Sequence, residues 1–96
     1  MESLFIVITS NTGHDPETTH QVFRSRAAAL EYMKSNYDLT HDILKQRQAL
    51  GKLDILDTEY RFASAGEMFI HYVDYQEPAD TEETITWKLV PATWGD

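Results

Sequence analysis

The chain has 96 residues, of which 42% are hydrophobic and 11% aromatic, and this composition is typical of a globular protein rather than a disordered one. It contains no cysteine, which excludes disulfide bonds and thiolate metal sites. Eight basic and sixteen acidic residues give a net charge of −8 without a basic cluster, which argues against direct binding to nucleic acid or anionic lipid.

The acidic charge is concentrated in one half of the chain. Residues 1–52 contain six acidic and six basic side chains, whereas residues 53–96 contain ten acidic side chains against two basic ones. Like charges gathered in this way repel one another, which favours a binding partner or a solubility role. We expect one domain over residues 1–96. The apolar run at 4–8 is too short for a signal peptide or a membrane span, so a cytoplasmic protein is expected.

The first predicted element is a buried strand over residues 3–9, which are rich in β-branched and aromatic side chains. The turn-prone residues 10–13 follow it. Asp15, Pro16 and Glu17 have the pattern of a helix start, with Asp15 as the N-cap. Residues 18–23 are poor helix formers, however, and fit a short edge strand beside the first one equally well. The sequence leaves both alternatives open.

Two helices are predicted next. Ser25 can cap a helix over residues 26–36. Its buried stripe would consist of apolar side chains at helix-compatible spacings, including one just before the cap: Phe23, Ala29, Leu30 and Met33. A second helix is predicted from Leu39 or Thr40 to Leu50, with Thr40 as its cap. Gly51 would close that helix in the left-handed conformation.

After Gly51 the spacing of hydrophobic residues shortens from a period of about 3.6 residues to a period of 2 residues, which predicts strands. Residues 56–64 form the first, with Leu56, Tyr60 and Phe62 facing the core. A turn at 64–67 leads to a central strand over 68–75, and a solvated loop over 76–83 leads to a last strand over 84–90. That strand buries Ile85, Trp87 and Leu89, and Pro91 ends it.

These elements predict an α+β domain. An N-terminal strand and two helices precede a three-stranded antiparallel meander, which packs against the helices.

The densest group of metal-ligand residues is His14, Asp15, Glu17 and His20. Their spacing matches no metal motif, and the carboxylates at 15 and 17 are already explained by helix capping. His41 and His71 are isolated, and the serines and glycines fall in no nucleophile or phosphate-binding motif. We therefore expect no catalytic residue, metal or cofactor and a protein that is not an enzyme. A metal- or ligand-binding domain that uses residues 14–20 is the alternative.

The acidic half offers a binding surface. Outward residues two apart on a strand, such as Asp57 and Glu59, lie roughly 6.6 to 7 Å apart, which is comparable with the phosphate spacing of a nucleic-acid strand. The charged residues predicted to contact a partner are Asp57, Glu59, Glu67, Asp74, Glu77, Glu82 and Glu83. Tyr75 and Trp94 join them, because tyrosine and tryptophan are enriched at binding hot spots.

These features predict a protein that binds a basic nucleic-acid-handling protein and inhibits or modulates it. The chain is short, acidic and cysteine-free, and in this general character it is similar to phage-encoded inhibitors of host enzymes, antitoxins and immunity proteins. A DNA mimic that acts against host defence in the bacterial cytoplasm is one form of this function. The alternatives are a surface that only keeps the protein soluble, and a homodimer or larger homo-oligomer built through Trp94 and an uncovered sheet edge.

Overall fold

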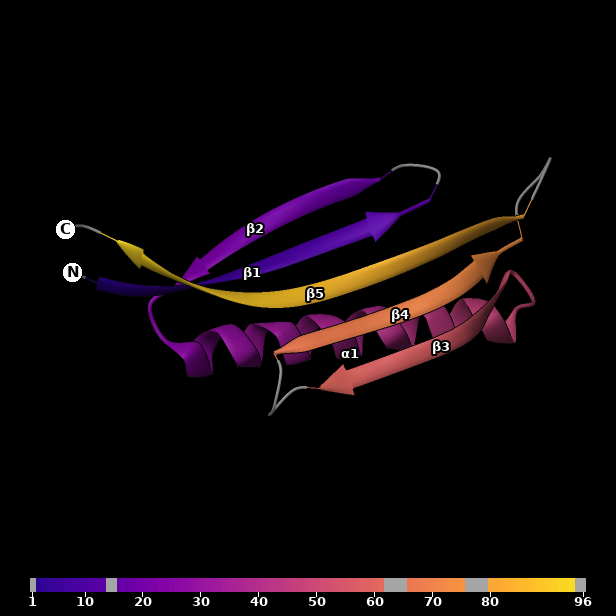
Figure 1. The fold of residues 1–96 in the computed structure, drawn as a ribbon. Coiled ribbons are helices and arrows are strands. Elements are labelled where there is room, and N and C mark those ends of the chain that lie inside the picture. Colours follow the sequence, from indigo (N-terminus) through magenta and orange to yellow (C-terminus); the bar gives the residue numbers. More distant parts are fainter. Residues whose placement is uncertain (1, 14–15, 62–65, 76–79, 95–96) are drawn as a thin grey trace.

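One helix and one sheet make up the fold in the computed structural model, which describes residues 2–13, 16–61, 66–75 and 80–94. The elements are β1 (Glu2–Thr12), β2 (Glu17–Phe23), α1 (Arg26–Ala49), β3 (Leu53–Arg61), β4 (Glu67–Asp74) and β5 (Thr81–Trp94). All neighbouring strands are antiparallel, in the order β2-β1-β5-β4-β3. The predicted α+β class and the β3-β4-β5 meander are confirmed. α1 lies along one face of the sheet, and no described element covers the other, which we call the open face (Figure 1).

The N-terminal segment is a β-hairpin. β1 extends the predicted strand to Thr12 and pairs with β2 on one side and β5 on the other. Of the two alternatives that the sequence left open here, the structure has the edge strand, because Glu17 begins β2. The Asn11 side-chain oxygen accepts the Glu17 N–H at 2.6 Å, which gives the first donor of β2 a partner. Asp15 lies outside the described residues.

A single helix of 24 residues replaces the two predicted helices. Ser25 caps it as expected and accepts the Ala28 N–H at 3.0 Å, and Gly51 follows it with a φ of 74°. The predicted break near Leu39 is wrong, because Tyr37 continues the buried stripe one turn after Met33 and packs on the sheet. Among the described residues no helix is long and apolar enough to cross a bilayer.

The first part of β3 departs from the predicted alternation. Leu53 is fully buried, whereas Leu56, predicted to face the core, is 51% exposed. A bulge between Ile55 and Asp57 shifts the alternation, so the residues that follow are displaced by one position. The Tyr60 side chain and Phe62 lie outside the described part of the chain.

β5 is longer than predicted at both ends. It begins at Thr81, inside the predicted loop, and it continues through Pro91 to Trp94. The Leu89 N–H donates to the Gly66 carbonyl at 2.8 Å and so points toward β4. Two residues later the Pro91 nitrogen has the same direction but lies beyond the end of β4, where no ladder donor is needed. Proline is tolerated there, and β1 keeps the strand paired.

The core lies between α1 and the inner face of the sheet. Ile85, Trp87 and Leu89 share that face, as predicted, and Trp87 is fully buried at its centre. The Trp87 indole meets the Tyr37 ring edge-on at 5.4 Å, and its Nε1–H donates to the Asn36 side chain at 3.0 Å. The fully buried residues around it are Val7, Ala29, Met33, Leu53, Met68 and Ile70.

The bulge in β3 can be tested with a matched pair of leucines. We expect Leu53→Ala to lower the free energy of unfolding by about 2–5 kcal/mol, because it leaves a cavity in the core. Leu56→Ala should cost roughly 1 kcal/mol or less, because that side chain is half exposed. Urea denaturation of the two variants measures both values, and a larger loss from Leu56→Ala would contradict the observed register.

Candidate functional site

The open face of the sheet carries an unusual number of apolar side chains. Residues directly opposite in paired strands share a face, and the sequence neighbours of the core residues point away from α1. At one end of the open face these neighbours form the apolar patch, which consists of Leu4, Ile6, Ile8, Val22, Val90 and Ala92. Val22 is 59% exposed and the other five are half-buried. An uncovered face of an antiparallel sheet is ordinarily polar, so this patch is a candidate contact surface.

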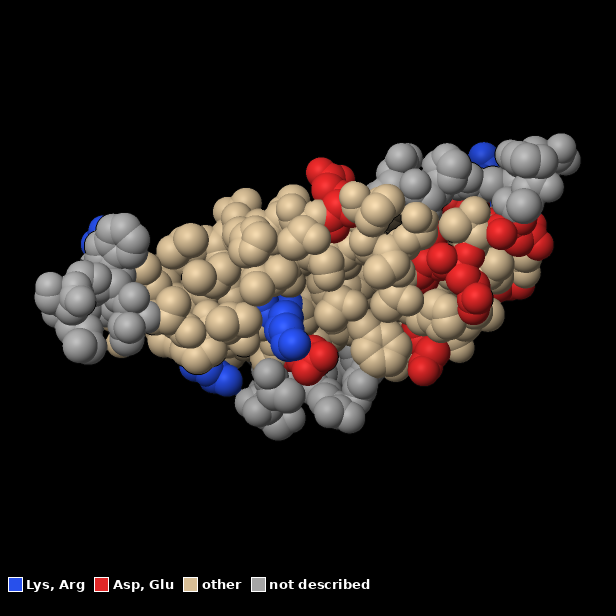
Figure 2. Space-filling model, turned by 45° about the horizontal axis from the view of Figure 1, so that its top comes forward, with Lys and Arg blue, Asp and Glu red and all other residues tan. Residues whose placement is uncertain are grey.

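Carboxylates occupy the opposite end of the same face. Four exposed residues lie where β3 begins, β4 ends and β5 begins, and we call them the acidic end: Asp54, Asp57, Asp80 and Glu82. Figure 2 shows acidic side chains gathered toward one end of the molecule, with a largely uncharged surface over much of the rest. The register explains the grouping, because Asp54 and Glu82 flank Val73 from the two neighbouring strands and Asp57 lies opposite His71.

Few strong partners neutralise the acidic end. The Tyr75 hydroxyl, on an exposed side chain, donates to an Asp54 carboxylate oxygen. His71 Nε2 lies 3.2 Å from Glu82 Oε1. Within the described ranges, neither Asp57 nor Asp80 has an ion pair with a basic side chain. The end therefore presents an accumulated negative field to solvent.

The predicted partner-binding residues do not all lie together. Asp57, Glu82 and Tyr75 lie at the acidic end, whereas half-buried Glu67 stands opposite Lys88 in the middle of the sheet. The side chains of Glu59 and Trp94, and Glu77 as a whole, lie outside the described residues. Asp54 and Asp80, which also lie at the acidic end, are not among the contact residues predicted from the sequence.

Two predicted contact residues face the helix instead of solvent. Asp74 is only 3% exposed, and its Oδ2 lies 3.6 Å from the Arg47 guanidinium of α1. Placing Asp74 on an exposed acidic surface is therefore wrong, because alternation along β4 turns it inward with Met68, Ile70 and Tyr72. A carboxylate at this depth requires a partner, and Arg47 supplies the opposite charge.

Glu83 is half-buried and lies opposite Tyr72, whose hydroxyl hydrogen-bonds with it. Burial is the largest of the causes that raise the pKa of Tyr72 to about 12. The negative charge of Glu83, this hydrogen bond and the negative charge of Asp74 act in the same direction, while Arg47 acts in the opposite one. Glu83 thus contributes to the packing of the helix side rather than to the acidic end.

The alternative site at residues 14–20 does not assemble from the residues that the structure describes. Glu17 and His20 are three positions apart on β2 and point to opposite faces of the sheet. His14 and Asp15 lie outside the described residues. In the described ranges no three or more histidine, aspartate or glutamate side chains are grouped to hold a metal ion.

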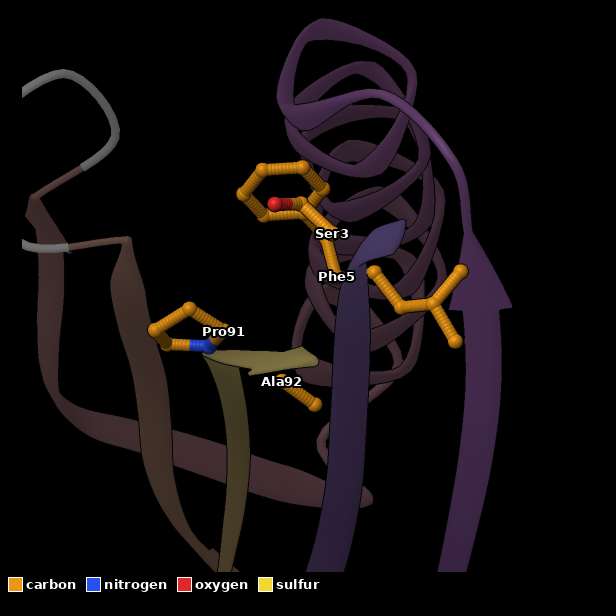
Figure 3. A pocket seen from close by; sticks show the side chains of 5 residues that line it. Ser3, Phe5, Pro91 and Ala92 are labelled. Carbon is orange, nitrogen blue, oxygen red and sulfur yellow. The ribbon is translucent and has the colours of Figure 1, made fainter. Parts of the chain in front are cut away.

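A hollow of about 410 Å³ lies at the far end of the sheet from the acidic end (Figure 3). Phe5 and Pro91, which are directly opposite in the register, line it with Ser3, Leu4 and Ala92. None of these side chains titrates near neutral pH, so the hollow offers no general acid or base.

The environment of Tyr72 predicts alkaline behaviour. A spectrophotometric titration should show a tyrosine that ionises near pH 12, and Tyr72→Phe should remove it. Because the folded-state pKa lies above the usual tyrosine pKa of 10.0, the associated stability is complete below pH 10 and is lost as the pH rises toward 12. Stability should therefore fall less steeply in Tyr72→Phe over this interval, and an unchanged titration would contradict the assignment.

No protein-family model matches the chain, and no curated protein or solved structure is significantly similar to it.

Proposed function

We propose that this protein is a non-enzymatic binding protein that attaches to a basic, nucleic-acid-handling protein and blocks or modulates it. The observation that carries the proposal is the acidic end itself, where Asp54, Asp57, Asp80 and Glu82 gather on a sheet face that no described element covers. An inhibitor of the DNA-mimic type, encoded by a phage and directed at a host enzyme, is the form of this function that we favour.

Charge supports a basic partner. The described body is elongated, with extents of 52 × 22 × 17 Å, and the acidic end lies at one extremity of its long axis. A net charge of −8 that is concentrated in this way gives the molecule an electric field that orients a basic protein before contact. Complementary charge raises the association rate and disfavours acidic partners, which accounts for specificity.

The grouping of the carboxylates supports a groove that ordinarily receives phosphates. Asp54 and Glu82 lie on strands separated by β4, so their backbones are two strand spacings apart, or roughly 9–10 Å. Asp57 extends the group along β3. Lysine and arginine side chains that neutralise phosphates in a nucleic-acid groove can equally meet a group of carboxylates.

Apolar side chains support a protein partner rather than a small cation. Val73 lies between Asp54 and Glu82, and Phe69 is the next apolar residue of β4 on the same face, beyond His71. Protein interfaces commonly combine an apolar centre with a polar rim, and burial of the centre supplies affinity that exposed charge pairs alone do not.

The test compares two triple variants that each remove three negative charges. Asp57→Asn, Asp80→Asn and Glu82→Gln neutralise the acidic end, and Glu31→Gln, Asp38→Asn and Asp42→Asn neutralise exposed positions on α1. Wild-type protein immobilised in a bacterial lysate should retain a basic nucleic-acid-handling protein, which duplex DNA or added salt displaces. The retained protein is then purified and titrated against each variant.

The acidic-end variant should bind about tenfold or more weakly, since three exposed ion pairs at roughly 0.5–1 kcal/mol each exceed the 1.4 kcal/mol of one decade. Its affinity should also depend less on salt, whereas the α1 variant should bind like the wild type at moderate salt. Equal losses in both variants, or a retained protein that DNA does not displace, would contradict the proposal.

A further inference from the structure

The described free edges of the sheet differ in how they resist pairing with another strand. β3 forms one outer edge, and it carries the bulge at Ile55 together with the exposed carboxylates of Asp54 and Asp57. Bulges and charges are the features by which sheet proteins prevent edge-to-edge association. On the side that faces β4, β5 has no described partner strand beyond Leu89, because β4 begins only at Glu67, and Pro91 lies there without an N–H to offer.

β2, the other outer edge, has neither a bulge nor a proline, and its carboxylate, Glu17, lies at its first residue. Its seven residues, Glu17–Phe23, pair with β1 in unbroken register and include no proline, lysine or arginine. Six of the seven are exposed, and Thr18, Thr19 and Val22 are β-branched. A regular, exposed strand with this composition is a template for another strand.

The alternation of hydrogen bonds between the strands determines which backbone groups of β2 point away from the sheet. The Leu89 N–H points toward β4. The backbone N–H and C=O of Val90, the next residue, therefore point toward β1 and bond with its partner there, Ile6. The backbone N–H and C=O of Val7 in β1 therefore point toward β2 and bond with its partner there, Gln21. By alternation, the groups directed away from the sheet are the N–H and C=O of Thr18, His20 and Val22.

We propose that β2 pairs with β2 of a second copy of this chain, antiparallel and about a two-fold axis at His20. His20 then lies opposite the same residue of the second copy, and Thr18 lies opposite Val22. Every outward N–H of the three residues meets an outward C=O, so the strand is complementary to itself in this register. The two sheets join into one continuous sheet, and both outer edges of the joined sheet are the protected β3 strands.

Charge and packing both suit this arrangement. The two-fold axis reverses the strand direction, so the acidic ends lie at opposite extremities of the dimer and do not repel each other at close range. Of the residues that meet across the axis, only Glu17 carries a full negative charge, and it lies opposite Phe23. Val22, which is 59% exposed in the single chain, gains the β-branched Thr18 of the second copy as a neighbour on the open face. The acidic end remains accessible, so the dimer does not depend on the proposed function.

Single cysteines test the register, since the native chain has none. In a hydrogen-bonded antiparallel pair the Cα atoms lie about 5.5 Å apart, which suits a disulfide bond. His20→Cys should therefore oxidise to a covalent dimer of twice the 11.1 kDa chain mass. Val22→Cys is the matched control on the same strand and face. Its two thiols are four residues out of register, roughly 13 Å apart, and should cross-link far more slowly.

The unmodified chain should also approach twice its monomer mass with rising concentration in sedimentation equilibrium. His20→Pro should shift this association to higher concentration, because it removes an outward donor while leaving the β1 ladder intact, and circular dichroism checks that it folds. Equal cross-linking of His20→Cys and Val22→Cys would overturn the proposal. A monomer at all concentrations would also overturn it. So would a dimer that is abolished by Ile6→Asp, in the apolar patch, and left unchanged by His20→Pro.

Discussion

The arrangement of helix and sheet depends on the packing of the buried Trp87 side chain. Its ring lies at the centre of the inner face, between Thr9 of β1 and Met68 of β4 in the register, and it brings the two halves of the sheet together beneath α1. Tyr37 and Asn36 of α1 contact the same indole, one by ring packing and one by a hydrogen bond. A helix that ended before Leu39 and restarted would misplace these partners, so the contact favours one continuous helix over two.

One helix can cover only one face of a five-stranded sheet. The covered face takes the buried side chains and also Asp74 and Glu83, which are thereby removed from the acidic surface. The other face retains the apolar patch and the exposed carboxylates near the start of β3 and β5. The division of the acidic half into structural and exposed carboxylates is therefore a consequence of strand alternation, and it determines which charges a partner can meet.

Local signals in the sequence were sufficient for the fold class and for several positions. The cap at Ser25, the left-handed Gly51 and the inward face of Ile85, Trp87 and Leu89 all depend on neighbouring residues and were predicted correctly. The wrong predictions depend on contacts distant in sequence. The helix continues through residues 37–40 because the sheet supports it, β5 passes Pro91 because β4 has ended, and the bulge that exposes Leu56 arises from pairing with β4. The acidic end was predicted only in part for the same reason, since Asp54 and Glu82 become neighbours through β4.

The two sheet edges differ in a way that follows from the distribution of charge. β3 belongs to the acidic half, so the carboxylates that form the acidic end also make this edge unsuitable for pairing. β2 belongs to the neutral half and has no such charges beyond Glu17. An acidic molecule that associates with itself must do so where its own charge is weakest, and that place is β2. The uneven charge of the sequence thus separates the surface that we propose for a basic partner from the edge that we propose for a second copy.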